Sequence, residues 1–160
     1  MHIWVDADAC PNTIKDILFR VANRTKTPVT LVANQPLSTP PSPYIKSIQV
    51  SAGFDVADNY IAQEAKAGDI VVTADIPLAA DIVANGALGI NPRGTLYTEQ
   101  NIKQTLAMRN FMEEMRSTGQ VSGGPAKMDQ RDNQAFANTL DRLLAKAIRL
   151  SKQESPPAQR

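Results

Sequence analysis

Five aspartates stand at positions where this chain could bind a metal ion. Asp6 and Asp8 are two residues apart near the start, which places both side chains on the same side of an extended segment. Asp75 ends the apolar run IVVTAD, Asp81 follows about one helical turn into the next segment, and Asp58 precedes that run in ADNYIA. Carboxylate oxygens with no thiol or imidazole beside them favour Mg²⁺ or Mn²⁺.

A group of converging carboxylates needs a cation, because crowding raises their pKa values unless positive charge is present. A bound divalent ion can activate water and stabilise the charge that develops on a phosphoryl group. We therefore predict a site in which Asp6, Asp58, Asp75 and Asp81 are catalytic, and in which the same four residues bind metal together with Asp8.

Helix capping is the alternative for most of these residues, since Asp is a common N-cap. Asp8, Asp55 or Asp58, and Asp75 all precede segments with helical periodicity. Asp6 is the exception, because it lies within the apolar run IWVDA and an unpaired buried acid is costly.

Basic and glycine-rich positions in the second half could contact a nucleic-acid backbone. Arg93, Lys127 and Arg131 offer positive charge, and Gly123 and Gly124 could present backbone amides to a phosphate. The alternatives are solvated surface charge and an ordinary loop between two helices.

The single cysteine and single histidine exclude several classes of site. Cys10 cannot form an internal disulfide, and one Cys with one His cannot build a usual zinc site. His2 lies on the predicted first strand, which leaves Cys10 without a catalytic partner. We expect Cys10 to be a small buried residue.

The charge is unevenly distributed along the 160 residues, although the net charge is only +1. Residues 1–92 contain six Lys/Arg and nine Asp/Glu, whereas residues 93–160 contain eleven and seven. This asymmetry suits a protein that holds cations beside a phosphate backbone. No apolar run approaches the roughly 18 to 20 residues of a membrane span, so we expect a cytoplasmic protein with no membrane partner.

The hydrophobic pattern predicts an α/β fold that would bring the acids together. Strands are expected at 2–7, 28–33, 48–52, 70–74 and 87–91, and helices at 12–24, 56–67 and 77–86. This alternation predicts a mainly parallel sheet of about five strands with helices on both faces. Ligands of such sheets bind outside the carboxyl ends of the strands, where the acids lie.

Two long amphipathic helices are expected after residue 99, and we predict that both pack on the sheet. They are joined by the segment STGQVSGGPAK. The proline-rich residues 35–43 cannot be helical and should form a loop. We expect one domain over 1–150 and a flexible tail at 151–160 that lacks apolar spacing.

Several motifs resemble a known family. They are VDADACP at the start, GFDVADNYIAQEAKAGDIVVTADIPLAADIVANG in the middle, NPRG at 91–94, and SGGP followed by DxxAFANTLDRL. Together they are similar to the YaiI-like and YqxD-like uncharacterised bacterial proteins, a family placed in the PIN-like superfamily. The resemblance implies a PIN-like three-layer α/β/α fold and a metal-dependent nuclease, with RNA favoured over DNA.

Individual residues can be matched to the nucleases of that superfamily. Asp6 resembles the acid that ends the first strand of PIN domains, and Asp58 resembles a helix acid of flap nucleases. Asp75 and Asp81 resemble the paired late acids. Asn59 stands where flap nucleases often have a second Asp, which puts a two-metal mechanism in doubt.

Two other functions fit parts of the sequence. A phosphatase of the haloacid dehalogenase type would use Asp6 as nucleophile and Asp8 as general acid, but it needs an active-site lysine and a cap, and it gives Asp58 no role. A catalytically inactive PIN-like module would bind RNA or a protein partner.

Overall fold

The computed structural model describes residues 1–53, 55–119 and 128–154. Its sheet has six strands in the order β3-β2-β1-β4-β5-β6. Neighbours pair in parallel except for β5 and β6, which are antiparallel. The mainly parallel sheet is therefore confirmed, with one short strand more than expected. The strands are β1 (Ile3–Asp6), β2 (Val29–Ala33), β3 (Ile45–Gln49), β4 (Ile70–Val72), β5 (Leu88–Ile90) and β6 (Leu96–Tyr97).

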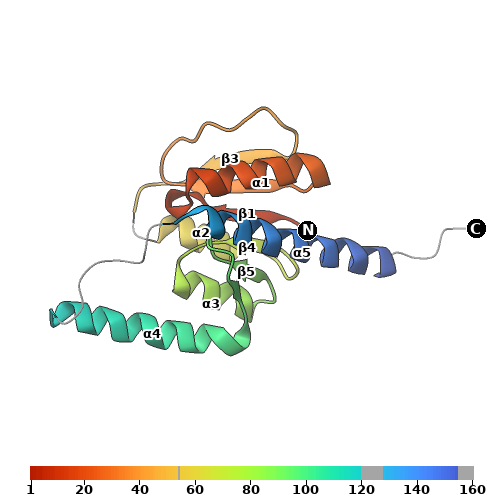
Figure 1. The fold of residues 1–160 in the computed structure, drawn as a ribbon. Helices are drawn as coiled ribbons and strands as arrows, with labels where there is room; N and C mark the ends of the chain where they lie inside the picture. Colours follow the sequence, from red (N-terminus) through yellow and green to blue (C-terminus); the bar gives the residue numbers. More distant parts are fainter. Residues whose placement is uncertain (54, 120–127, 155–160) are drawn as a thin grey trace, which may run out of the picture.

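Helices lie on both faces of this sheet (Figure 1). Buried residues of α1 and α5 share one core cluster with one face of the sheet, and those of α2 and α3 share another with the opposite face. The result is the three-layer α/β/α arrangement. The helices are η1 (a 3-10 turn, Ala7–Ala9), α1 (Asn12–Thr25), α2 (Val56–Glu64), α3 (Ile76–Ala84), α4 (Glu99–Ser117) and α5 (Gln130–Glu154).

The central position of β1 in the sheet explains why its sequence does not alternate between apolar and polar residues. Ile3 and Val5 pack against the α1 and α5 side, whereas Trp4 packs against the α2 and α3 side. Every residue of β1 is buried, as expected for a parallel sheet covered on both faces. The last of them, Asp6, is an acid at the carboxyl end of the strand.

Helix α4 does not form a layer on a face of the sheet, so that prediction is wrong. It meets the sheet at the edge strand β6, where the Asn101 side chain donates to the carbonyl oxygen of Leu96 at 2.9 Å. Its N-terminal part contacts α3 through Ile102, which shares a buried cluster with Ala79 and Tyr97. Further along, Met108 and Phe111 are 59% and 53% exposed. Both faces of the sheet are already covered by other helices, and α4 lies on the outer side of α3 (Figure 1).

Helix α5 extends past the predicted domain boundary at residue 150, because it is helical to Glu154. Lys, Gln and Glu are good helix formers, which accounts for the extra turn. Residues 155–160 of the predicted tail lie outside the described part of the chain. Within the described residues, no helix combines the length and apolar character needed to cross a bilayer.

The sheet topology creates a crevice between β1 and β4. From β1 the chain builds β2 and β3 on one side, and it then returns to place β4 on the other side of β1. The connection after β1 runs toward β2, and the connection after β4 runs toward β5 on the opposite side. The two connections therefore diverge at the carboxyl ends of β1 and β4 and leave a crevice between them. Ligands of doubly wound sheets bind in this crevice.

Candidate metal centre

A cavity of about 410 Å³ lies at the carboxyl ends of β1 and β4. We call it the acidic cavity, because five of the ten described residues that line it are aspartates. None of the ten is a lysine or arginine. The ten residues are Asp6, Asp8, Ala9, Asn34, Gly53, Asp55, Ala57, Asp58, Ala74 and Asp75.

Three carboxylates converge most closely in this cavity. Asp55, Asp58 and Asp75 each offer an oxygen, and the three oxygens lie within 4.8 Å of one another. Asp55 immediately precedes α2 in a left-handed conformation (φ 63°), and its side chain makes no capping hydrogen bond. Asp75 does cap α3, through an oxygen that accepts from the backbone N–H of Leu78 at 2.8 Å. Helix capping therefore does not explain the position of Asp55. For Asp75, capping uses only one of the two carboxylate oxygens.

The pKa of Asp58 is strongly raised in the cavity. Partial burial raises its pKa to about 7, with further contributions from a side-chain hydrogen bond with Asp75 and from the charges of Asp6, Asp75 and Asp55. Without a cation, Asp58 therefore keeps its proton to a higher pH than an ordinary carboxyl group does. A divalent ion would replace that proton and relieve the repulsion.

Asp6 lies deeper and is held by a threonine. Its side chain is 7% exposed, and one carboxylate oxygen accepts from the Thr73 hydroxyl at 2.9 Å. Burial raises the pKa of Asp6, and the nearby charges of Asp75 and Asp8 add to the effect. The Thr73 hydroxyl oxygen also accepts from the backbone N–H of Asp75 at 2.9 Å, so one buried side chain positions two of the acids.

Asp8 and Asn34 close the other side of the cavity. The Asp8 carboxylate accepts from the backbone N–H of Asn34 at 2.8 Å, which ties η1 to the end of β2. The Oδ1 atom of Asn34 is buried and has no hydrogen-bond partner among the described residues. An unsatisfied buried acceptor costs about 1–3 kcal/mol, and a hard cation or its bound water would satisfy it. The donor set of carboxylate and amide oxygens fits Mg²⁺ or Mn²⁺.

Asp81 is not brought into the acidic cavity. Its side chain is exposed on α3, and it is absent from the described lining residues. It stands six residues after Asp75, and six helical residues turn the chain by about 240° and advance it by about 9 Å. The expectation that Asp81 reaches back to the same edge is therefore not met. Asn59 is also exposed and outside the lining.

Three residues of this site were not identified from the sequence as site residues. Asp55 precedes Asp58 by three positions, and side chains at that spacing share a helix face, so the pattern contained a usable signal. Asn34 directly follows β2 and Thr73 directly follows β4. Both could have been found by examining every residue at a strand end rather than the acids alone.

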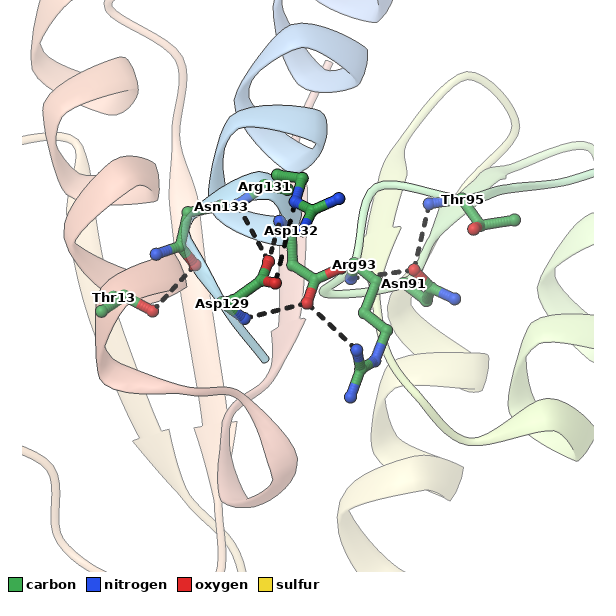
Figure 2. Close-up of polar contacts among 8 residues, drawn as sticks. All are labelled: Thr13, Asn91, Arg93, Thr95, Asp129, Arg131, Asp132 and Asn133. Carbon is green, nitrogen blue, oxygen red and sulfur yellow. Dashed lines mark hydrogen bonds and ion pairs between the residues drawn. The ribbon is translucent and has the colours of Figure 1, made fainter. Parts of the chain in front are cut away.

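Arg93 connects the turn after β5 to the start of α5 (Figure 2). Its guanidinium donates to Asp132 at 3.0 Å, and the two side chains are 33% and 22% exposed. The Asp132 side chain also accepts from the backbone N–H of Asp129 at 3.0 Å, and the Asp129 side chain accepts from the backbone N–H of Asp132 at 3.2 Å. These reciprocal contacts form a capping box at the N-terminus of α5.

The predicted substrate-binding residues are thus only partly placed by the structure. Arg93 is engaged with α5, and Arg131 is 95% exposed with its Nε atom 4.0 Å from Asp129. Neither belongs to the described lining of the acidic cavity. The remaining predicted contacts, Gly123, Gly124 and Lys127, lie outside the described residues.

Cys10 is buried, as predicted. Burial raises the pKa of its thiol to about 12, and a thiol needs to ionise to act as a nucleophile. Its position beside the acids therefore adds no covalent chemistry to the cavity.

The fold and this cavity define a doubly wound α/β protein with a carboxylate cluster at the switch point of its sheet. Comparison with known proteins identifies the family: residues 4–146 match the profile described as "Uncharacterized BCR, YaiI/YqxD family". The chain belongs to this family, as the sequence motifs indicated.

Relatives of similar length support the same assignment. A UPF0178 protein of Saccharophagus degradans is 61% identical over 149 residues, covering 93% of this chain and 99% of the relative. Those of Hahella chejuensis and Shewanella amazonensis are 62% and 60% identical over 146 residues, covering 91% of this chain and 97% and 98% of the relatives. A search of the solved structures found no significant match.

Proposed function

We propose that this protein is a nuclease that depends on Mg²⁺ or Mn²⁺ and hydrolyses phosphodiester bonds in the acidic cavity. The observation that carries the proposal is the convergence of Asp55, Asp58 and Asp75 oxygens within 4.8 Å, with no basic side chain among the described lining residues. The three carboxylates repel one another, and a bound divalent cation would relieve this repulsion. The resemblance to PIN-like proteins makes RNA the first substrate to test.

The residues of the cavity would have different roles. Asp55, Asp58 and Asp75 would hold the ion, with Asp6 and Asp8 beside them and the amide oxygen of Asn34 as a neutral donor. When bound, the ion supplies water activation and charge neutralisation. Thr73 holds Asp6 and the backbone of Asp75 in place.

The backbone of the fold supports an anionic substrate at the same edge. Helices α2 and α3 begin at the cavity, and α1 begins shortly after η1. The N-termini of helices carry partial positive charge and attract phosphate groups. We therefore propose that the phosphate backbone approaches this rim, where the net charge of the acids is offset by the bound ion.

The phosphatase alternative is less well supported by the geometry. A covalent nucleophile has to reach the phosphorus atom, but Asp6 is 7% exposed and its carboxylate is bonded to Thr73. An inactive module that binds RNA or a protein remains the second candidate. The proposal includes the cytoplasm as the place of action, because a free thiol such as Cys10 is typical of that compartment.

The test compares purified wild-type protein with Asp58→Asn and with Asp81→Asn, which is an exposed acid outside the cavity. Each is incubated with single-stranded RNA, single-stranded DNA and p-nitrophenyl phosphate, in Mn²⁺ and in chelator. We expect wild type to cut the polynucleotide only with metal, Asp58→Asn to lose about 100-fold or more, and Asp81→Asn to match wild type.

Other results would select the alternatives. Ester turnover with a trapped aspartyl phosphate at Asp6 would establish the phosphatase. Binding of RNA without cleavage in any metal would leave the binding module.

A further inference from the structure

A second hollow, which we call the side pocket, lies between α1 and the loop after β2. Its volume is about 310 Å³. The half-buried side chains of Phe19 and Leu37 form its apolar walls and pack against the core that contains Leu31. In Figure 1 this loop arches above α1 and β3 before the chain enters β3. An aromatic ring beside an aliphatic side chain provides a surface on which a flat, apolar-faced ligand can stack.

The side pocket adjoins the acidic cavity through two chain segments. Asn12 of the pocket follows Ala9 of the cavity by three residues, and Leu37 follows Asn34 by the same interval. Three residues span at most about 11 Å. The two hollows are therefore close enough for neighbouring units of one polymer to occupy both.

The polar groups of the side pocket are not used by the fold. The side chains of Asn12, Asp16 and Ser38 line the pocket and make no hydrogen bond within the described part of the chain. Lys15 adds a positive charge beside them. A ligand with hydrogen-bonding edges and an anionic link would engage these groups.

The larger groove between α1 and α5, about 610 Å³, differs in this respect. Two pairs of its polar side chains bond across it, Thr13 to Asn133 at 3.2 Å and Arg24 to Asp141 at 2.7 Å. That groove is accounted for by the packing of two helices, whereas the side pocket is not.

We propose that the side pocket binds an unpaired nucleobase of a single-stranded substrate whose adjacent phosphate lies at the acidic cavity. This inference rests on the proposed function for the identity of the polymer. The base would stack on Phe19, and Asp16 would accept a hydrogen bond from an exocyclic amino group. Lys15 would lie near the connecting phosphate. Bases in a duplex are paired and stacked within it, so a duplex would not fill the pocket.

The experiment measures binding in the Asp58→Asn background, which removes cleavage. The probes are a fluorescein-labelled single-stranded RNA decamer and its duplex, followed by fluorescence anisotropy. Phe19→Leu removes the aromatic face and keeps an apolar side chain of similar size, so that folding is preserved. Phe111→Leu is the control, because Phe111 is 53% exposed on α4. Melting temperatures of both variants are compared with the parent.

We expect Phe19→Leu to weaken single-strand binding by about tenfold, which corresponds to one stacked base, and Phe111→Leu to have no effect. Equal affinity of Phe19→Leu and its parent, or equal affinity for single strand and duplex, would overturn the inference. If Phe19 controls binding but wild-type protein cuts no RNA in Mn²⁺, the side pocket stands and the nuclease proposal falls. If wild-type protein cuts RNA but Phe19→Leu does not change binding, the nuclease proposal stands and the side-pocket inference falls.

Discussion

Asp58 is the residue at which a proton and a metal ion would compete. Its carboxyl group bonds to Asp75 and senses the charges of Asp6 and Asp55. When the cavity holds no cation, a proton is the only means of lowering the local negative charge. The protonation of Asp58 therefore links the state of the cavity to the stability of the whole domain.

The stability of the metal-free protein should fall as the pH rises from about 4 to about 7. In this window the folded protein keeps the proton of Asp58, since its pKa is about 7, while the unfolded chain has released it at about 4. The folded state binds more protons, so raising the pH disfavours it. The measurement is thermal unfolding in chelator at about pH 5 and about pH 8.

Asp58→Asn is the matched variant for this prediction. It should raise stability at the higher pH by about 1 kcal/mol, a figure reduced for solvent screening, and it should flatten the pH dependence. Mn²⁺ should stabilise wild type more than the variant at the higher pH. A wild-type protein that is more stable at about pH 8 than at about pH 5 in chelator would contradict this account.

The acids show how far residue patterns predict a site. Asp6, Asp8, Asp58 and Asp75 line one cavity because parallel strands and the helices near them share an edge, and this follows from the order of elements. Asp81 does not join them, although α3 begins within one residue of its predicted start, because six helical residues turn its side chain about 240° away from Asp75. The catalytic roles of all these residues remain predictions.

At the scale of elements, the turn between β5 and β6 is the contact that positions α5. Gly94 has φ of 94°, and its carbonyl oxygen accepts from the Thr139 hydroxyl at 2.8 Å. A Cβ at this glycine would lie 2.6 Å from the carbonyl carbon of Ala135. The backbones of the turn and α5 therefore touch directly, and the Arg93 pair with Asp132 lies beside them.

Gly94→Ala should destabilise the protein strongly, and Gly68→Ala is its control. Both glycines have positive φ, 94° and 87°, but a Cβ at Gly68 meets no atom within 4 Å. The control should therefore lose only the backbone cost, about 1–2 kcal/mol. Gly94→Ala adds a clash with backbone that cannot rotate away, so we expect a loss roughly twice as large or more. Urea unfolding measures both, and equal losses would show that α5 can shift.

The order and type of the elements could be predicted from the sequence, but their packing partners could not in every case. The buried central strands and the helices α1, α2 and α3 follow from apolar runs and helical period. The position of α4 does not, because an amphipathic pattern shows that one face is apolar and not which element covers it. Met108 and Phe111, exposed on α4, illustrate this limit.

At the scale of the whole molecule, the charges favour contact with few phosphates. The net charge is only +1, and the acids at the switch point oppose a polyanion until an ion is bound. RNA affinity in the Asp58→Asn background should therefore depend weakly on salt, with a log–log slope of roughly −2 for two or three single-strand phosphates. Anisotropy titrations across KCl concentrations measure the slope. A slope steeper than about −5 would require a broad basic surface.

The order of synthesis gives the position of α5 a further consequence. Phe136 and Leu140 of α5 are fully buried in the same cluster as Ile3 and Val5 of β1, so a helix that is synthesised after all six strands covers the first strand. Until α5 has emerged from the ribosome, the part of that face that α5 covers stays open to chaperones and to other chains. Premature termination just before α5 would therefore yield an aggregation-prone fragment rather than a smaller functional protein.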